Sequence, residues 1–301
     1  MIAIFRYNRD DVQKRAFLMP FSTVEISSSG DLPEGVHFVT VRSVALNRRA
    51  DLSMYVPAGM HSRALPLVIL LHGVYGSHWA WLFKGHAHRV LERLMREEGL
   101  PPMVLAMPSD GLWGDGSAYL RHEHADYARW IMEEVPAAAA LVAPQTAHTS
   151  RFICGLSMGG YGALRLGALY PNQFAAISAH SSITDFVQMQ EFVEERPHQF
   201  ALAEDHPLGV LSCMKSHAHS LPPLRFDCGS GDRLIHHNRL LHQGLDDAGI
   251  AHVYEEFPGE HTWEYWHDHL ADSLRFFAAH LAQDHGAPPC QGETMITVPF
   301  L

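Results

Sequence analysis

Two kinds of hydrophobic pattern follow one another along the chain. The first sixty residues hold alternating or β-rich segments separated by Gly, Pro and Asn, which predict antiparallel strands and hairpins. These segments are FSTVEISSSG (21–30), GVHFVTVRSVAL (35–46) and ADLSMYVPAG (50–59). From residue 65 onward the apolar residues form short, nearly continuous runs, which are typical of parallel strands covered on both faces. The pattern therefore predicts an antiparallel N-terminal part followed by a mostly parallel sheet.

Six apolar runs alternate with helical segments in this second part. The runs are LPLVILLHG (65–73), PMVLAMPSDG (102–111), RFICGLS (151–157), FAAISAHSS (174–182), PLRFDCGSGD (223–232) and HVYEEFPGEH (252–261). The helical segments cover 86–99, 124–135, 159–171, 236–249 and 262–281. Strands that alternate with helices of about 10–15 residues predict an α/β fold with a doubly wound, mostly parallel sheet.

One stretch breaks the alternation of strands and helices. Residues 183–223 are rich in Phe, Met, His and Glu and predict a small helical cap inserted into the domain. Residues 287–301 form a C-terminal tail without an informative pattern. Because the chain contains no internal repeat, we expect a single domain over 1–301 that carries one insertion.

Composition and charge limit the classes of binding partner and the cellular compartment that we expect. With 22 basic and 33 acidic residues the formal net charge is −11, which argues against nucleic acid or an anionic membrane surface as a partner. The N-terminal segment is charged within ten residues and lacks the apolar core of a signal peptide, and no run of about 18 apolar residues exists. The four cysteines show no CxxC spacing. We expect a cytoplasmic, soluble protein, and the sequence leaves a homo-oligomer open.

A glycine-flanked serine lies between a predicted strand and a predicted helix. Ser157 sits in CGLSMGGYG, two residues from Gly155 and from Gly159. This is the G-x-S-x-G pattern of a nucleophile elbow, in which a sharp turn exposes the serine hydroxyl and leaves no room for neighbouring Cβ atoms. A phosphate-binding loop would need GxxxxGK[ST] or GxGxxG, and neither pattern is present here. The context therefore predicts that Ser157 is a nucleophile.

A serine nucleophile needs a base, and the base needs a carboxylate that orients it. Asp232 follows one later strand and His261 follows the next, with one helix between them. Both residues thus stand where the acid and the base of such a fold are expected. The competing carboxylates are Asp227 inside an apolar strand, Asp205 in the insertion, and Asp246 and Asp247 late in a helix.

Backbone donors for an oxyanion can be assigned from the same strand ends. The run 65–73 ends in His-Gly, so the amide of Val74 is one candidate donor, and the amide of Met158 is the other. His72 itself is better explained as an orienting or packing residue than as part of a substrate pocket.

Aromatic residues and one further histidine are candidates for the substrate pocket. They lie near predicted strand-end loops and comprise Trp79, Trp81, Trp113, Trp263 and His180, together with His72. Packing in the core explains the tryptophans nearly as well. His180 is equally well explained as a pocket wall or as a contact to the cap.

Histidine pairs raise the question of a metal site. Spacing of two residues occurs at His86/His88, His122/His124, His217/His219 and His267/His269. Two residues two apart on a helix do not share a face, and HExxH is absent. We therefore expect solvated or capping histidines, and neither a metal nor a cofactor.

At these motifs the sequence resembles the family of esterase D and S-formylglutathione hydrolase, within the α/β-hydrolase superfamily. The matching stretches are ADLSMYVPAG, LPLVILLHG, PSDGLWGDG, GLSMGGYGALRLGALYP, CGSGD and GEHTWEYW, which together span roughly residues 40 to 280. The resemblance implies a serine hydrolase of short acyl or acetyl esters, including tributyrin-type and feruloyl-type substrates. It also implies a triad of Ser157, Asp232 and His261, with oxyanion amides at Val74 and Met158.

These observations predict a carboxylesterase that hydrolyses small-molecule esters through an acyl-enzyme. S-formylglutathione hydrolases more usually carry GHSMGGHGA and a DxF acid loop, whereas this chain has GLSMGGYGA and GDRLI. That thioesterase is therefore the alternative. An acyltransferase would use the same triad with an alcohol or thiol in place of water, and the sequence does not separate the two.

Overall fold

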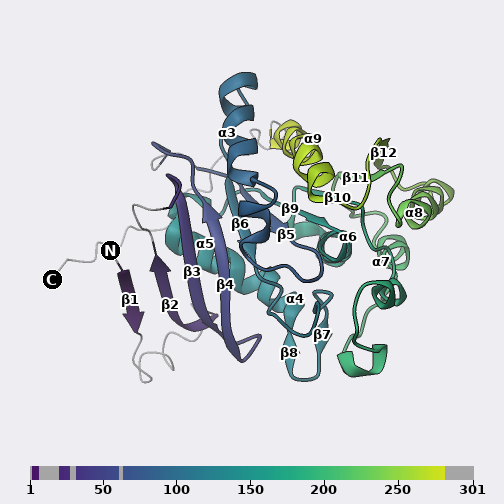
Figure 1. Cartoon of the computed structure of the whole chain (residues 1–301), viewed down its shortest axis with the longest axis horizontal. Coiled ribbons are helices and arrows are strands. Elements are labelled where there is room, and N and C mark those ends of the chain that lie inside the picture. The colour runs from purple at the N-terminus through teal and green to yellow at the C-terminus, as the bar shows by residue number, and fades with distance from the viewer. Residues whose placement is uncertain (1, 7–19, 28–31, 61–63, 282–301) are drawn as a thin grey trace.

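The structure is a computed structural model that describes residues 2–6, 20–27, 32–60 and 64–281. These residues form a mixed sheet of ten strands with helices packed against it (Figure 1). The strand order is β1-β2-β3-β4-β6-β5-β9-β10-β11-β12. The predicted tail 287–301 lies outside the described residues. The expected α/β-hydrolase type of sheet, with antiparallel strands first and parallel strands after them, is confirmed.

The antiparallel part contains four strands. They are β1 (Ile2–Arg6), β2 (Phe21–Ser27), β3 (Val36–Ser43) and β4 (Arg48–Tyr55), and β4 pairs antiparallel with β6. The last three coincide with the predicted segments. β1 was not predicted as an element, because its few residues carry no repeated alternation.

The parallel part follows the six apolar runs. Its strands are β5 (Leu67–Leu71), β6 (Val104–Pro108), β9 (Arg151–Leu156), β10 (Ala176–His180), β11 (Leu224–Gly229) and β12 (Val253–Phe257). Each is parallel to its neighbours within this group. Because the strands are parallel, their carboxyl ends meet at one edge of the sheet, where ligands bind in open α/β folds.

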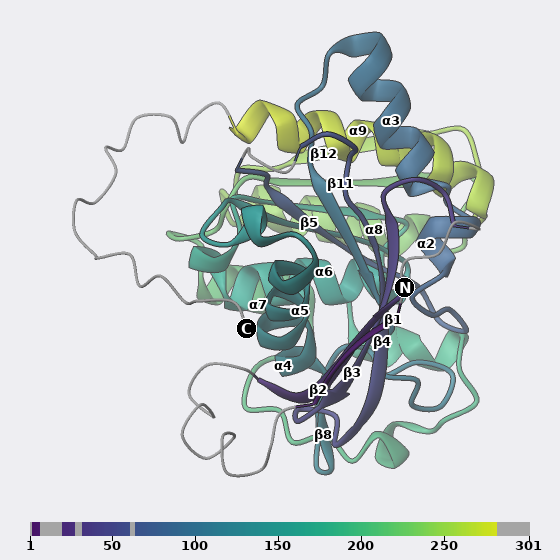
Figure 2. The ribbon, with the colours of Figure 1, turned by 90° about the vertical axis from the view of Figure 1, so that its left-hand side faces the viewer.

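Helices cover both faces of this sheet (Figure 2). One face holds α2 (Ala80–Phe83), α3 (Ala87–Glu98) and α9 (Trp263–Leu281), and the other holds α5 (Val135–Val142), α6 (Met158–Leu169), α7 (Val210–Ser216) and α8 (Ile235–Asp247). Along β5, Ile69 belongs to the core on the α6 side and Leu70 to the core on the α3 side. Burial on both faces explains why these strands are apolar without alternation.

One predicted helix differs from the observed one. The segment expected at 124–135 begins at Tyr127 and continues to Val142, as α4 (Tyr127–Arg129), a π-helical turn η1 (Trp130–Glu134) and α5. The alanine-rich stretch after Val135 continues the helix because alanine has the highest helix propensity. Before it, β7 (Arg121–His122) and β8 (Ala125–Asp126) form a short two-stranded sheet.

The inserted stretch 183–223 contains little regular structure. It holds the 3₁₀ turns η4 (Phe186–Glu191) and η5 (Pro197–Phe200), followed by α7, which packs against α6 and α8. The remaining 3₁₀ turns are η2 (Pro144–Thr146) and η3 (Pro171–Gln173). That 183–223 acts as a cap over a site stays a prediction.

Candidate active site

Ser157 occupies the turn between β9 and α6 in a strained backbone conformation. Its φ of 53° and ψ of −119° lie outside the regions that L-residues favour. The Ser157 amide donates to the His180 carbonyl at 3.0 Å, and its carbonyl accepts from the Ile183 amide at 3.2 Å. These bonds to the last residue of β10 and to the segment after it hold the turn in place and keep the serine at the carboxyl edge of the sheet.

The flanking glycines are required by close backbone contacts. A Cβ atom on Gly155 would collide with the carbonyl of Gly159, and one on Gly159 would collide with the carbonyl oxygens of Leu71 and His72. Both obstacles are backbone atoms, which cannot turn away as a side chain can. The G-x-S-x-G spacing is therefore a steric requirement of this turn.

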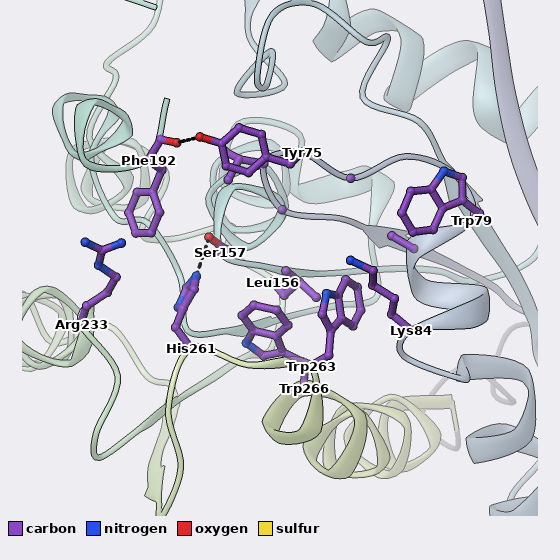
Figure 3. A pocket seen from close by; sticks show the side chains of 14 residues that line it. Tyr75, Trp79, Lys84, Leu156, Ser157, Phe192, Arg233, His261, Trp263 and Trp266 are labelled. Carbon is purple, nitrogen blue, oxygen red and sulfur yellow. Dashed lines mark hydrogen bonds between the residues drawn. The ribbon is translucent and has the colours of Figure 1, made fainter. Parts of the chain in front are cut away.

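A continuous chain of hydrogen bonds joins Ser157, His261 and Asp232. The His261 Nε2 atom lies 3.0 Å from Ser157 Oγ, and its Nδ1 atom lies 2.8 Å and 3.0 Å from the two carboxylate oxygens of Asp232 (Figure 3 shows the first bond). The Leu234 amide donates to Asp232 Oδ1 at 2.8 Å, so the carboxylate is fixed from a second side. The structure thus brings together the three residues that the sequence singled out.

The competing carboxylates are placed elsewhere. Asp227 is fully buried on β11 and bonds to the side chains of His180, Arg225 and Tyr265. Asp205 is exposed beside Arg121, while Asp246 and Asp247 lie on exposed positions at the end of α8. None of the four lines the pocket around Ser157.

The two predicted oxyanion donors stand beside the serine. Val74 lines the same pocket as Ser157, and Met158 begins α6 directly after it. A Cβ atom on Gly73 would approach the Ser157 Cβ to 3.2 Å, which shows how closely the Val74 loop passes the serine. Neither amide donates a hydrogen bond to another described residue. Two free N–H groups beside a serine hydroxyl are what an oxyanion site requires.

His72 holds the loop that contains Gly73 and Val74 in place through hydrogen bonds. The Asp110 amide donates to His72 Nε2 at 3.0 Å, so the ring proton resides on Nδ1, which donates to the Gly73 carbonyl at 2.7 Å. Burial lowers the pKa of His72, although the nearby Asp110 carboxylate acts in the opposite direction. The neutral imidazole therefore fixes the carbonyl that precedes the Val74 amide.

A pocket of about 390 Å³ opens at Ser157. Of the predicted pocket residues, Trp79 and Trp263 line it, together with Val74, Ser157 and His261 (Figure 3). The wall also contains Trp266, whose ring meets the His261 ring edge-on at 4.9 Å between centroids.

Four predicted pocket residues do not line it. Trp81 is buried and donates through Nε1 to the Leu71 carbonyl at 2.9 Å, and Trp113 packs against the rings of His122 and Phe200. His72 is buried below the Val74 loop. His180 is fully buried and bonds to Asp227 at 2.8 Å and to Ser273 at 2.8 Å, so it is neither a pocket wall nor a cap contact. Strand-end position alone did not reveal which way these rings point.

Among the aromatic and charged residues of the lining, five were not predicted from the sequence: Tyr75, Lys84, Phe192, Arg233 and Trp266. Three of them lie beside residues that were identified, since Tyr75 follows Val74, Arg233 follows Asp232, and Trp266 lies one helical turn after Trp263. Lys84 and Phe192 carry no signal in the sequence. The Tyr75 hydroxyl donates to the Phe192 carbonyl and so joins the Val74 loop to the insertion (Figure 3).

One histidine group has the spacing of metal ligands, but it lies away from this pocket. Ligand atoms of His242, Asp246 and His252 fall within 4.8 Å of one another on α8 and the segment before β12. None of the three lines the pocket, and none belongs to the His-X-His pairs. The group is therefore not part of the lining around Ser157.

Comparison with known proteins identifies the family to which the chain belongs. A family model described as "Putative esterase" matches residues 43–277, which is most of the chain. The chain belongs to this family. A curated relative, an acetyl esterase of Caldicellulosiruptor saccharolyticus, is 29% identical over 236 residues, which cover 72% of this chain and 85% of the relative.

Solved structures show the same fold in other esterases. A ferulic acid esterase matches with a TM-score of 0.69 and 24% identity, over 82% of this chain and 98% of its own. An S-formylglutathione hydrolase from Agrobacterium tumefaciens matches with a TM-score of 0.70 and 19% identity, over 84% of this chain and 98% of its own. The chain has the α/β-hydrolase fold and is a carboxylic ester hydrolase. Among its described helices, none is both long and apolar enough to cross a bilayer.

Proposed function

We propose that the esterase hydrolyses short-chain acyl esters, of the acetyl, butyryl and feruloyl types, through an acyl-enzyme on Ser157. The observation that carries this proposal is the hydrogen-bonded chain from Ser157 Oγ through His261 to Asp232. A pocket of about 390 Å³ is at the small end of the range of about 300–1,000 Å³ for ligand sites, which supports short acyl groups.

The proposed steps follow from the roles of these groups. His261 Nε2 takes the Ser157 proton as the oxygen attacks the ester carbonyl, and the Val74 and Met158 amides stabilise the oxyanion. Asp232 holds the His261 ring by its Nδ1–H and offsets the charge of the imidazolium. His261 then gives its proton to the leaving alcohol, and water attacks the acyl-enzyme with His261 again as base.

The same groups supply every catalytic role, so the proposed reaction uses neither a metal nor a cofactor. The acidic balance of the chain supports a small-molecule ester as its partner, rather than nucleic acid or a membrane surface. We also propose a cytoplasmic location, as expected from the sequence.

The test compares wild type with Ser157→Ala on p-nitrophenyl acetate and p-nitrophenyl butyrate. Removing the nucleophile should lower kcat by about 10⁴-fold or more, because the triad acts as a unit. Acid quenching of the wild type during butyrate turnover should leave a butyryl group on the peptide that contains Ser157, detected by mass spectrometry. Wild-type turnover by Ser157→Ala would refute the proposal. Feruloyl esters and S-formylglutathione, measured in parallel, rank the substrates.

A further inference from the structure

The pocket at Ser157 is positively charged in a protein that is acidic overall. The chain has 33 acidic and 22 basic residues, yet the pocket lining includes Lys84 and Arg233 and no aspartate or glutamate. A cleft with one sign of charge and apolar walls concentrates ions of the opposite sign. The charge of this pocket therefore differs from that of the molecule around it.

Neither cation is neutralised by a residue that the structure describes. Within the described ranges, the side chains of Lys84 and Arg233 form no ion pair and no hydrogen bond. Lys84 Nζ lies 5.4 Å from the ring centre of Trp79 and 5.8 Å from that of Trp263, and Arg233 Cζ lies 4.9 Å above the Phe192 ring. Cation–π contacts of this kind position a cation but leave its N–H donors available.

The two cations lie on opposite sides of the serine. Figure 3 shows Lys84 beside Trp79 and Trp263 on one side, and Arg233 beside Phe192 and His261 on the other. Under the proposed mechanism His261 gives its proton to the leaving alcohol, so the alcohol part of an ester departs on the Arg233 side. The acyl part then extends toward Lys84.

Three carboxylates act on the pocket-lining residue Tyr75. Burial raises the pKa of Tyr75, and the charges of Asp115, Glu194 and Glu195 raise it further. Two of these groups accept backbone hydrogen bonds, from the Glu194 amide to Asp115 Oδ2 at 2.9 Å and from the Asp115 amide to Glu195 Oε1 at 3.2 Å. None of the three carboxylates pairs with Lys84 or Arg233 among the described residues, so the donors of both cations stay unpaired.

We propose that this pocket selects anionic esters, with Lys84 as the binding site for a carboxylate on the acyl part and Arg233 as the site for a carboxylate on the alcohol part. The inference rests on the proposed role of Ser157 and adds the substrate class to it. Ammonium and guanidinium groups that are not already paired are the donors that proteins use to bind carboxylates.

Two matched substrate pairs test the proposal at the two ends of the pocket. For the acyl part, the p-nitrophenyl monoester of adipic acid is compared with its neutral methyl-capped analogue. For the alcohol part, 3-acetoxybenzoate is compared with its neutral methyl ester. Wild type should favour the anionic member of each pair by several-fold up to about tenfold in kcat/KM, as expected for a partly exposed charge pair. Ser157→Ala gives the background hydrolysis to subtract.

Variants separate the two ends. Lys84→Met should abolish the preference in the adipate pair, and Lys84→Arg should retain it. Arg233→Met should abolish the preference in the benzoate pair. Lys215→Met removes an exposed lysine on α7 outside the pocket and should leave both ratios and the activity unchanged. Each readout is a ratio between two esters, so a general loss of activity in a variant does not mimic the result.

The outcomes separate a failure of the inferred anion selectivity from a failure of the proposed esterase function. Equal or lower kcat/KM for the anionic members in wild type, with Ser157-dependent turnover of the neutral ones, overturns the anion selectivity alone. A preference that responds to Lys84→Met in the benzoate pair instead of the adipate pair overturns the assignment of the two ends. Activity that survives Ser157→Ala overturns the proposed function itself.

Discussion

Ser157 is held in place by atoms of the main chain on three sides. Its amide bonds to the last residue of β10 and its carbonyl to the segment after β10, and Gly159 leaves no space between α6 and the end of β5. The positive φ of Ser157 costs on the order of 1–3 kcal/mol, so the surrounding contacts must over-determine it. The position of the proposed nucleophile thus depends on glycines outside the proposed triad.

Gly159→Ala should disrupt this arrangement. The new Cβ atom would meet the carbonyls of Leu71 and His72, and the shift of α6 away from β5 would displace Ser157. We expect esterase activity to be lost and the melting temperature to fall, measured by p-nitrophenyl butyrate turnover and circular dichroism. Gly244→Ala on α8 is the matched control, because its Cβ atom would meet only the movable end of Leu211. Wild-type activity in Gly159→Ala would contradict the steric account.

The candidate site was partly predictable at the residue scale. Ser157, Asp232 and His261 could be found because each follows the end of a strand, and strand ends are visible in the sequence. Trp81 and His180 could not be assigned correctly, because whether a ring near a strand end faces a pocket or the core depends on contacts with α9. Lys84 is placed by its contact with Trp263, which is distant in sequence.

At the scale of elements, a buried charged network joins β10, β11 and α9. Asp227 accepts hydrogen bonds from Arg225 at 2.6 Å and from the Tyr265 hydroxyl at 2.9 Å, and it lies 2.8 Å from His180 Nδ1. Burial alone would lower the pKa of His180, but the Asp227 carboxylate raises it to about 10. Burial likewise opposes ionisation of Asp227, while His180 and Arg225 lower its pKa to about 2.

This network makes the stability of the protein depend on pH. The raised pKa of His180 gives a contribution that is complete below its unfolded value of about 6.5 and is lost as pH rises toward 10. The lowered pKa of Asp227 gives one that is complete above about 3.8 and is lost as pH falls toward 2. The network therefore stabilises the fold most between about pH 4 and 6.5.

Asp227→Asn should remove this pH dependence between pH 6.5 and 9. Loss of one member of a buried ion pair costs about 3–5 kcal/mol of unfolding free energy, so the melting temperature should fall at every pH. The difference between wild type and variant should be smaller at pH 9 than at pH 6.5, as measured by thermal denaturation. Arg239→Gln breaks an exposed pair with Glu256 and should change stability by about 1 kcal/mol or less. A constant difference would contradict the buried imidazolium.

On the scale of the whole molecule, histidine content governs the charge. The chain has 23 histidines and a formal charge of −11 at pH 7 with these neutral, and its isoelectric point from the sequence is about 6.1. Protonation of exposed histidines between about pH 7 and 6 should therefore cancel most of the negative charge. Proteins near zero net charge self-associate more readily.

We expect light scattering by a concentrated solution to peak near pH 6 and to fall on either side. Far-ultraviolet circular dichroism over the same range should stay constant, because the association proposed here does not require unfolding. A monotonic change in scattering would show that some other surface property governs association.

The sheet was largely predictable because its pattern repeats. Six apolar runs gave six parallel strands, and the change to alternation before residue 60 gave the antiparallel strands β2 to β4. β1 was missed because one short strand contains too few residues to define a pattern, and α2 because four residues cannot define a helical period. The extension of the helix to Val142 was missed because a run of alanines has no polar face.

The neighbouring positions of Asp232 and Arg233 have a consequence for protein engineering. The loop between β11 and α8 carries both the carboxylate that bonds to His261 and the cation at one end of the pocket. Mutations in this loop that change selectivity would therefore also be expected to change turnover. Trp79 and Lys84, at the two ends of α2, bond to none of the three residues of the Ser157–His261–Asp232 chain. Libraries restricted to that segment would vary the proposed acyl end of the pocket while the proposed triad keeps its geometry.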